Sequence, residues 1–244
     1  MQESDWFESW FCSPYYKILY QNRDEFEAEA FVEALLTYLQ PLPGSHMVDI
    51  ACGEGRYSVQ LAEHGYDVTG IDLSTTSIAK AKAYENDTLH FYVHDMRMPF
   101  YINYFDYAFN FFTSFGYFAH NRDHLLAAKS FTGALKKDGI LVIDYLNTEN
   151  ILSNLEAESN IQRGSYTFQI RRKLENNHFV KDIYFTDAEN KERHYNESVA
   201  AFTLADFIRI FKTAGMSLVA TFGDYKLNTY HPIESPRLIM VFKK

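Results

Sequence analysis

Residues 47–57 read Met-Val-Asp-Ile-Ala-Cys-Gly-Glu-Gly-Arg-Tyr, and this stretch decides the fold. Val48 and Ile50 lie in a short apolar run that predicts a buried strand. Gly53 and Gly55 follow, and glycine adopts backbone angles that a side chain would block, so the pair predicts a tight turn. With a helix after it, this turn presents backbone N–H groups at the carboxyl edge of a parallel sheet. Such turns bind ligands, although they also close α/β units that bind nothing.

A second strand ends in an acidic residue. Residues 66–72 read Tyr-Asp-Val-Thr-Gly-Ile-Asp, which places Asp72 at a strand end 19 residues after Gly53. A carboxylate at the tip of the neighbouring strand accepts hydrogen bonds from ribose hydroxyls. Nicotinamide dinucleotides and S-adenosylmethionine (SAM) both contain that ribose, so these two strands do not choose between the two cofactors.

The composition narrows the classes of function. The chain has 244 residues, enough for one α/β domain with a small insertion. Its net charge is −9 and it has no run of Lys and Arg, which disfavours nucleic acid as a partner. The aromatic share of 17% suits a deep pocket, but also an ordinary aromatic core.

The sequence predicts a cytoplasmic protein without a metal. Cys12 and Cys52 are too few for a disulfide framework, and no apolar run is long enough for a signal segment or a membrane span. His90 and His94 fall about 13 Å apart along a predicted strand, too far to share one ion.

Strands and helices alternate through the first part of the chain, which predicts a parallel sheet. The expected strands are about 46–51, 66–72, 89–95, 105–112 and 140–145, and the expected helices are 24–39, 55–64, 74–84 and 123–136, the last ended by Gly139. A short helix at about 149–158, an antiparallel meander of strands 166–174, 179–186 and 194–202, a helix at 204–214 and strands at about 216–222 and 237–243 complete the chain.

Several motifs together resemble class I SAM-dependent methyltransferases, in particular the bacterial small-molecule type. The matching pieces are Val-Asp-Ile-Ala-Cys-Gly-Glu-Gly, Gly-Ile-Asp-Leu-Ser, His-Asp-Met, Phe-Asp-Tyr-Ala, Leu-Lys-Lys-Asp-Gly-Ile-Leu and Thr-Ala-Gly-Met, in this order. The family's first motif has Gly where this chain has Ala51. The resemblance implies an α/β fold with a Rossmann-like seven-stranded sheet and a small antiparallel β insertion.

The residue patterns also predict a division of the chain. Residues 1–40 would form an aromatic arm and helix that belong to a lid, with an N-terminal arm packed on the domain as the alternative. Residues 41–160 together with 203–244 would form the SAM-binding domain, and 161–202 the insertion on the substrate side.

The resemblance to this family also implies which residues hold the cofactor. Asp49, Ala51, Gly53 and Gly55 would shape the loop around the methionine end of SAM. Further along the chain, Asp72 would bind the ribose, Leu73 would lie against adenine, and Asp95 and Met96 would bind the edge of the base. Asn110 begins a segment that passes beneath the transferred methyl group. Asp95 also fits a turn or helix cap.

The aromatic arm and the histidines supply the remaining candidates. In the family, an arginine from the arm holds the SAM carboxylate and a tyrosine covers the sulfonium, which here selects Arg23, Tyr16 and Tyr20. Arg23 equally suits an ion pair with Glu27. His120 is the best-placed candidate for a general base, with a solvated histidine at a helix start as the alternative.

Phe115 and Tyr117 suit the acceptor side or a plain core, and His231 is the second candidate for a general base. Pro232, Ser235 and Arg237 suit the pocket mouth, where Arg237 would bind an anion, although Arg237 equally fits a position flanking the last strand.

The function that follows is methyl transfer from SAM to an N or O atom of a small molecule, by a monomer or homodimer. An NAD-dependent oxidoreductase and a catalytically silent SAM-binding module are the alternatives. The nicotinamide fingerprint has a third glycine where this chain has Ser58.

Overall fold

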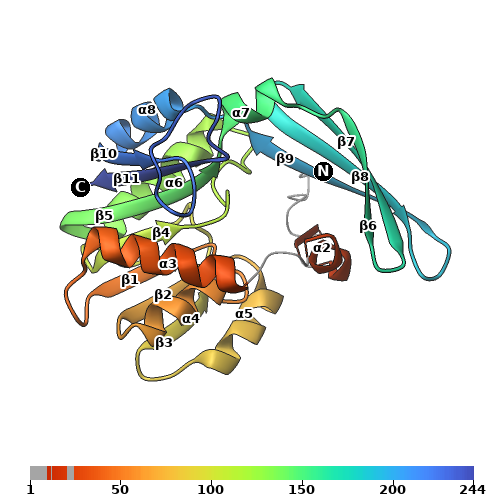
Figure 1. Ribbon diagram of the computed structural model, residues 1–244. Helices are drawn as coiled ribbons and strands as arrows, with labels where there is room; N and C mark the ends of the chain where they lie inside the picture. Colours follow the sequence, from red (N-terminus) through yellow and green to blue (C-terminus); the bar gives the residue numbers. More distant parts are fainter. Residues whose placement is uncertain (1–9, 12, 21–24) are drawn as a thin grey trace.

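A seven-stranded sheet forms the centre of the computed structural model, which describes residues 10–11, 13–20 and 25–244 (Figure 1). The strand order is β10-β11-β5-β4-β1-β2-β3, and β11 alone runs in the opposite direction to the other six strands. The strands are β1 (His46–Ile50), β2 (Asp67–Asp72), β3 (Leu89–Val93), β4 (Phe105–Asn110), β5 (Leu135–Leu146), β10 (Ser217–Phe222) and β11 (Arg237–Lys243). This confirms the predicted Rossmann-like seven-stranded fold.

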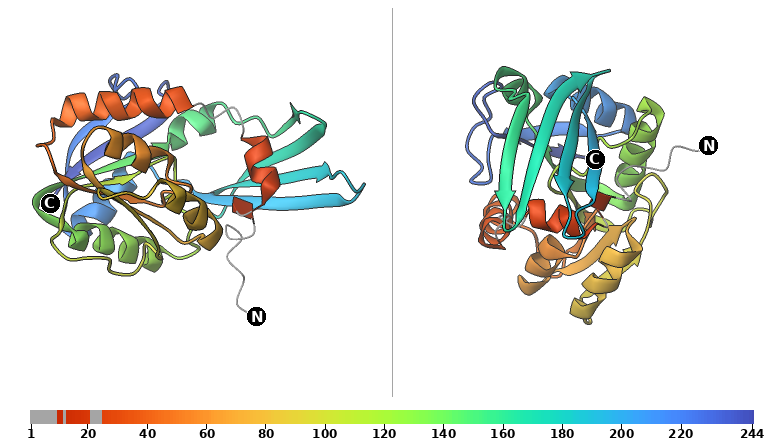
Figure 2. Two further views of the ribbon diagram at one scale, coloured as in Figure 1. Left: turned by 90° about the horizontal axis from the view of Figure 1, so that it is seen from below. Right: turned by 90° about the vertical axis from the view of Figure 1, so that its right-hand side faces the viewer.

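Helices cover both faces of this sheet (Figure 2). One face carries α3 (Glu25–Leu39), α4 (Arg56–Glu63) and α5 (Thr75–Ala81), which continues as the single 3-10 turn η1 (Lys82–Tyr84). The other face carries α6 (Asn121–Ala134) and α8 (Leu204–Ala214). Because both faces are covered, the strands bury continuous apolar runs and leave polar groups at their ends.

The bounds of α8 follow from its local chemistry. The Thr203 hydroxyl accepts from the N–H of Asp206, while the Asp206 carboxylate accepts from the N–H of Thr203, which makes a capping box. Gly215 ends the helix with a φ of 97°, a left-handed angle that glycine adopts without strain. The sequence predicted the same bounds.

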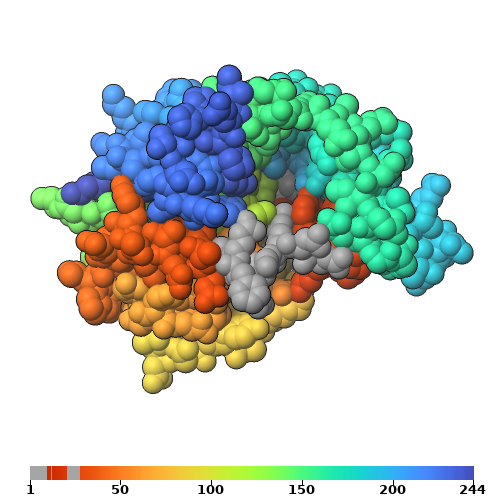
Figure 3. Space-filling model, in the orientation of Figure 1, coloured from red at the N-terminus to blue at the C-terminus, as the bar shows by residue number. Residues whose placement is uncertain are grey.

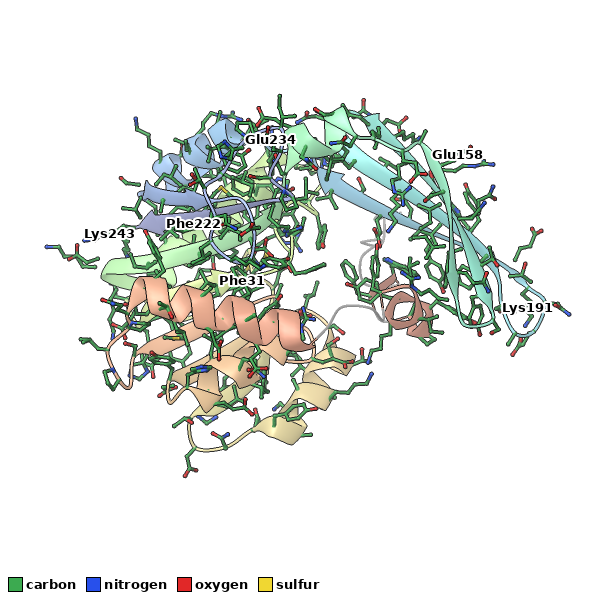
Figure 4. The ribbon with its side chains drawn as sticks, in the orientation of Figure 1. Phe31, Glu158, Lys191, Phe222, Glu234 and Lys243 are labelled. Carbon is green, nitrogen blue, oxygen red and sulfur yellow. The ribbon has the colours of Figure 1, made fainter. Side chains whose placement is uncertain are left out.

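A second sheet projects beyond the first. It contains β6 (Glu158–Arg163), β7 (Tyr166–Glu175), β8 (His178–Thr186) and β9 (Glu192–Ala200), paired in that order and antiparallel throughout. Figure 4 labels Glu158 at the start of β6 and Lys191 beside the tip of the β8–β9 hairpin, far from Phe31 on α3. The predicted division of the chain at residues 161 and 202 stays a prediction.

Three predictions about helices and strands were wrong. The short helix α7 ends at Ser153 and not near 158, and the meander has a fourth strand, β6, with alternating half-buried and exposed residues that give only a weak apolar signal. Gly139 does not break a helix, because α6 has already ended at Ala134 and β5 starts at Leu135.

The described part of the N-terminal arm packs inside the curve of the second sheet (Figures 1 and 2). Helix α2 (Pro14–Leu19) and Trp10 join an apolar cluster with residues of β7 and β8. The indole of Trp10 donates to Glu197 at 2.6 Å, and the Tyr20 hydroxyl donates to the same carboxylate at 2.7 Å. The arm is therefore anchored to the second sheet. Within the described residues, no helix has the length and apolar character needed to cross a membrane.

Candidate active site

A cavity of about 540 Å³ lies where the carboxyl ends of β1, β2 and β4 meet the arm. Figure 3 shows the hollow between the second sheet and the main body on this side of the molecule. The walls of the cavity come from the glycine loop, from the ends of β2 and β3, from the segment after β4, and from α2. The predicted site residues among the walls are Tyr16, Asp49, Ala51, Gly53, Asp72, Leu73, Asp95 and Met96.

Asp72 connects the glycine loop to the end of β2. Its carboxylate accepts from the N–H of Gly53 at 2.8 Å and from the N–H of Ser74 at 2.8 Å. Burial raises the pKa of Asp72, and these two N–H groups oppose the rise. Two carboxylate oxygens offer about four lone pairs, so Asp72 keeps acceptor capacity toward the cavity.

The three small residues of the loop have different tasks. Ala51 adopts a φ of 61°, the left-handed region in which the family motif has glycine. Gly53 has a φ of 59° with open space where a Cβ would point, so the backbone there can be approached closely. Gly55 does not line the cavity. A Cβ on Gly55 would lie 2.5 Å from Phe91 Cζ, so this glycine permits α4 to pack against β3.

Asp49 is buried at the bottom of the loop. Its side chain accepts from the Ser58 hydroxyl at 2.6 Å, and burial raises its pKa to about 7 although that hydrogen bond lowers it. Because a cation beside the carboxyl would favour its charged form, the group is suited to a ligand with an ammonium.

Asp95 is held by a neighbour that the sequence did not single out. Arg97 donates from Nε at 3.0 Å and from Nη2 at 2.6 Å, and its guanidinium lies 5.0 Å from the ring centre of Phe118. Burial raises the pKa of Asp95, but the hydrogen bonds and charge of Arg97 outweigh it and hold the pKa below its ordinary value. Asp95 is therefore an oriented, charged acceptor at the wall of the cavity.

The segment after β4 forms a further wall. Phe111, Phe112, Ser114 and Tyr117 line the cavity. Phe115 does not, since it is fully buried between α6 and α8. Two further predicted residues, Asn110 and Gly55, also lie away from the cavity walls. The side-chain amide of Asn110 donates to the Ile50 carbonyl at 2.9 Å instead.

The arm closes the cavity on the side facing the second sheet. Phe11, Tyr16 and Lys17 line it, and Lys17 Nζ lies 2.5 Å from Glu54 Oε1 in the glycine loop. Tyr20 lies outside the walls, where its hydroxyl contacts Glu197 and Lys181. The predicted carboxylate partner Arg23 lies outside the described residues.

The histidines predicted near the site do not reach it. His120 is exposed at the N-cap of α6, and neither His120 nor His231 lines the cavity. Arg237 is half-buried beneath the segment after β4 and does not line the cavity. Among the described residues, no three His, Cys, Asp or Glu side chains are grouped in a way that would hold a metal ion.

Comparison with known sequences identifies the central part of the chain. The profile of a family described as a methyltransferase domain matches residues 48–143. A putative methyltransferase of Bacillus subtilis is 38% identical over 104 residues, which are 40% of this chain and 41% of that protein. A putative methyltransferase of a Geobacillus strain is 29% identical over 144 residues, 57% of this chain and 58% of that protein. The matched region thus spans about half the length of these relatives.

The proteins that match over most of the chain have lower sequence identity to it. A glycine/sarcosine N-methyltransferase of Aphanothece halophytica is 26% identical over 239 residues, 93% of this chain and 85% of that protein. A SAM-dependent methyltransferase structure from Clostridium acetobutylicum has a TM-score of 0.79 at 16% identity, covering 94% and 95% of the two chains. A sugar N-methyltransferase structure from a Streptoalloteichus species has a TM-score of 0.72 at 20% identity, covering 94% and 92%.

The sequence motifs, the strand order and the matched domain agree. Residues 48–143 are a methyltransferase domain, and the fold is that of class I SAM-dependent methyltransferases, as the motifs predicted. SAM is the cofactor of that domain.

Proposed function

We propose that the protein transfers the methyl group of SAM to a nitrogen or oxygen atom of a small molecule. The observation that carries the proposal is one cavity lined by the glycine loop, Asp72 and the Asp95–Met96 pair. These three groups come from the ends of successive strands, and together they suit the loop, sugar and base contacts of one nucleoside.

The residues of the cavity fit SAM group by group. Gly53 would admit the methionine part, Asp49 its ammonium, Asp72 the ribose hydroxyls and Asp95 the adenine amino group. When bound, SAM supplies an already activated methyl group on a sulfonium. The chain's own task is then to orient the acceptor and to exclude water, which the arm supports by closing one side of the cavity.

The acceptor side of the cavity favours a small molecule with an apolar portion. Its walls include the rings of Phe11, Tyr16, Tyr117 and Phe118, with centroids 5.0 Å apart for Phe11 and Tyr16 and 5.4 Å apart for Phe11 and Tyr117. Ser114 and the two tyrosines add hydroxyl groups for orientation. The similar proteins named for glycine, sarcosine and sugar nitrogens make an amine the first acceptor class to screen.

Ligand binding tests the cofactor assignment directly. We expect SAM and its demethylated product S-adenosylhomocysteine to raise the melting temperature of the wild type, and NAD to leave it unchanged. Asp72→Ala removes the partner of the ribose, so it should abolish most of the shift, at a loss of about 2 kcal/mol for hydrogen bonds to a charged acceptor. Asp87→Ala, at an exposed position outside the cavity, is the matched control.

Equal shifts in the wild type and Asp72→Ala would contradict the role of Asp72. A shift with NAD but not with SAM would contradict the proposed function. A screen of amines and sugars with methyl-labelled SAM then tests transfer, and tight SAM binding without any labelled product would favour a silent binding module.

A further inference from the structure

Two consecutive residues beneath the cavity have strained backbones. Phe112 and Thr113 follow β4 with φ angles of 59° and 61°. Neither is glycine, and Thr113 is β-branched, a type of residue for which a left-handed φ is a genuine outlier. Such angles cost about 1–3 kcal/mol for each residue and persist only where surrounding groups hold them. Phe112 lines the cavity, as do Phe111 before it and Ser114 after it.

A largely buried ion pair between Asp144 and Arg237 holds this segment. Asp144, at the end of β5, accepts from the Phe112 N–H at 2.9 Å through its side chain and from the Thr113 N–H at 2.9 Å through its carbonyl. Arg237, at the start of β11, donates to the Asp144 carboxylate at 2.8 Å and to the Thr113 hydroxyl at 2.9 Å. Tyr225 adds a hydrogen bond to Asp144 at 3.2 Å.

The burial of the pair makes stability alone a poor explanation for it. The Asp144 side chain is 0% exposed and that of Arg237 is 17% exposed. Apolar residues of similar volume stabilise a core as well as a buried ion pair does, or better. What they would not supply is the set of directed hydrogen bonds to the backbone of Phe112 and to the hydroxyl of Thr113.

We propose that Arg237 and Asp144 are positioning residues that hold the left-handed backbone of Phe112 and Thr113, and thereby fix the wall that Phe111, Phe112 and Ser114 present to bound SAM and acceptor. The inference rests on the proposed function for the identity of the ligand. It links the C-terminal strand β11, which has no residue in the cavity walls, to the shape of the binding site.

Binding of S-adenosylhomocysteine, measured by isothermal titration calorimetry, tests the role. Arg237→Gln leaves the Asp144 charge without its partner, and we expect its dissociation constant to rise about tenfold or more. Arg237→Lys keeps the positive charge but cannot donate to Asp144 and Thr113 at the same time, so its dissociation constant should lie between those of the wild type and Arg237→Gln. Arg193→Gln is the matched control, because Arg193 pairs with the buried Asp187 in the second sheet, away from the cavity walls.

Thr113→Gly separates positioning from folding. Glycine adopts the left-handed angle without hydrogen bonds that hold it there. Adding Thr113→Gly to Arg237→Gln should therefore lower the dissociation constant at least about threefold from that of Arg237→Gln alone. A purely structural role would lower the melting temperatures of Arg237→Gln and Arg193→Gln alike and give no such recovery. If Arg237→Gln does not fold, Arg237→Lys with and without Thr113→Gly provides the same comparison.

The outcomes are distinct. A folded Arg237→Gln, or Arg237→Lys in its place, that binds within about twofold of the wild type overturns the inference, and so does an absence of recovery by Thr113→Gly. A wild type that binds neither S-adenosylhomocysteine nor SAM overturns the proposed function instead.

Discussion

At the scale of single residues, the glycine loop contains one strained position. Ala51 has a φ of 61°, and an L-residue in this region costs about 1–2 kcal/mol. Ala51→Gly should therefore raise the free energy of unfolding by up to about 1 kcal/mol, since part of the relief is offset by the greater chain entropy of glycine. Urea denaturation of both proteins measures the difference.

An alanine-to-glycine substitution within a helix should change the free energy of unfolding in the opposite direction. Ala79 is exposed within α5, and Ala79→Gly should lower the free energy of unfolding by about 1 kcal/mol, the helix penalty of glycine. If both variants lose stability equally, the left-handed angle of Ala51 is not a source of strain.

Residue types and spacing predicted much of the site but not the direction of each side chain. Asp49 and Asp72 lie at the ends of their strands and Asp95 just beyond the end of β3, and parallel strands bring those ends to one edge, so all three line the cavity. Asn110 also ends a strand, yet it points to the Ile50 carbonyl, a direction that depends on the local twist. The pairing of Lys17 with Glu54 had no sequence signal, because the second sheet positions α2.

At the scale of elements, one glycine joins the segment after β4 to the second sheet. Gly116 has a φ of 101°, and its carbonyl accepts from the N–H of Ala200 at 2.8 Å. The Tyr145 hydroxyl donates to the Ala200 carbonyl at 2.6 Å, and a Cβ on Gly116 would lie 2.3 Å from that hydroxyl oxygen. The contact between β5, β9 and the cavity wall therefore leaves no room for a side chain at position 116.

Gly116→Ala should be strongly destabilising, by about 3 kcal/mol, because it combines an unfavourable φ with overpacking. Gly133→Ala is the control, since a Cβ there meets nothing within 4 Å and α6 gains a better helix former. Thermal unfolding of both variants measures the contrast. Similar melting temperatures for the two variants would mean that the segment after β4 adapts without cost.

Elements with strong local signals were predicted well, and those defined by pairing were not. The capping box and terminal glycine marked α8 to the residue. Strand β6 is half exposed, with its register set by β7, and β5 starts before Gly139 because it pairs along β11 and β4. Long-range pairing of this kind is not encoded in the local sequence pattern.

At the scale of the whole molecule, a buried histidine lies where the second sheet returns to the main body. His124 is 2% exposed, with its ring 4.8 Å from that of Phe202, 5.2 Å from Phe118 and 5.4 Å from Phe115. Neither ring nitrogen makes a hydrogen bond within the described part of the chain. Burial lowers its pKa from 6.5 to about 4, His178 adds to the shift, and the carbonyls of Gly116 and His120 oppose it.

The low pKa makes the junction sensitive to acid. Between pH 6.5 and 4 the unfolded chain binds a proton at His124 that the folded chain does not, so the stability present above pH 6.5 is lost as the pH falls, by up to about 3 kcal/mol. His124→Leu removes this proton, and its free energy of unfolding should fall by about 2 kcal/mol less than that of the wild type between pH 7 and 4.5. Urea denaturation at each pH measures the two slopes, with His64→Leu, at an exposed position, as the control for replacing a histidine by leucine. Parallel pH profiles for the wild type and His124→Leu would show that His124 is not buried in its neutral form, and that the return of the second sheet is packed differently.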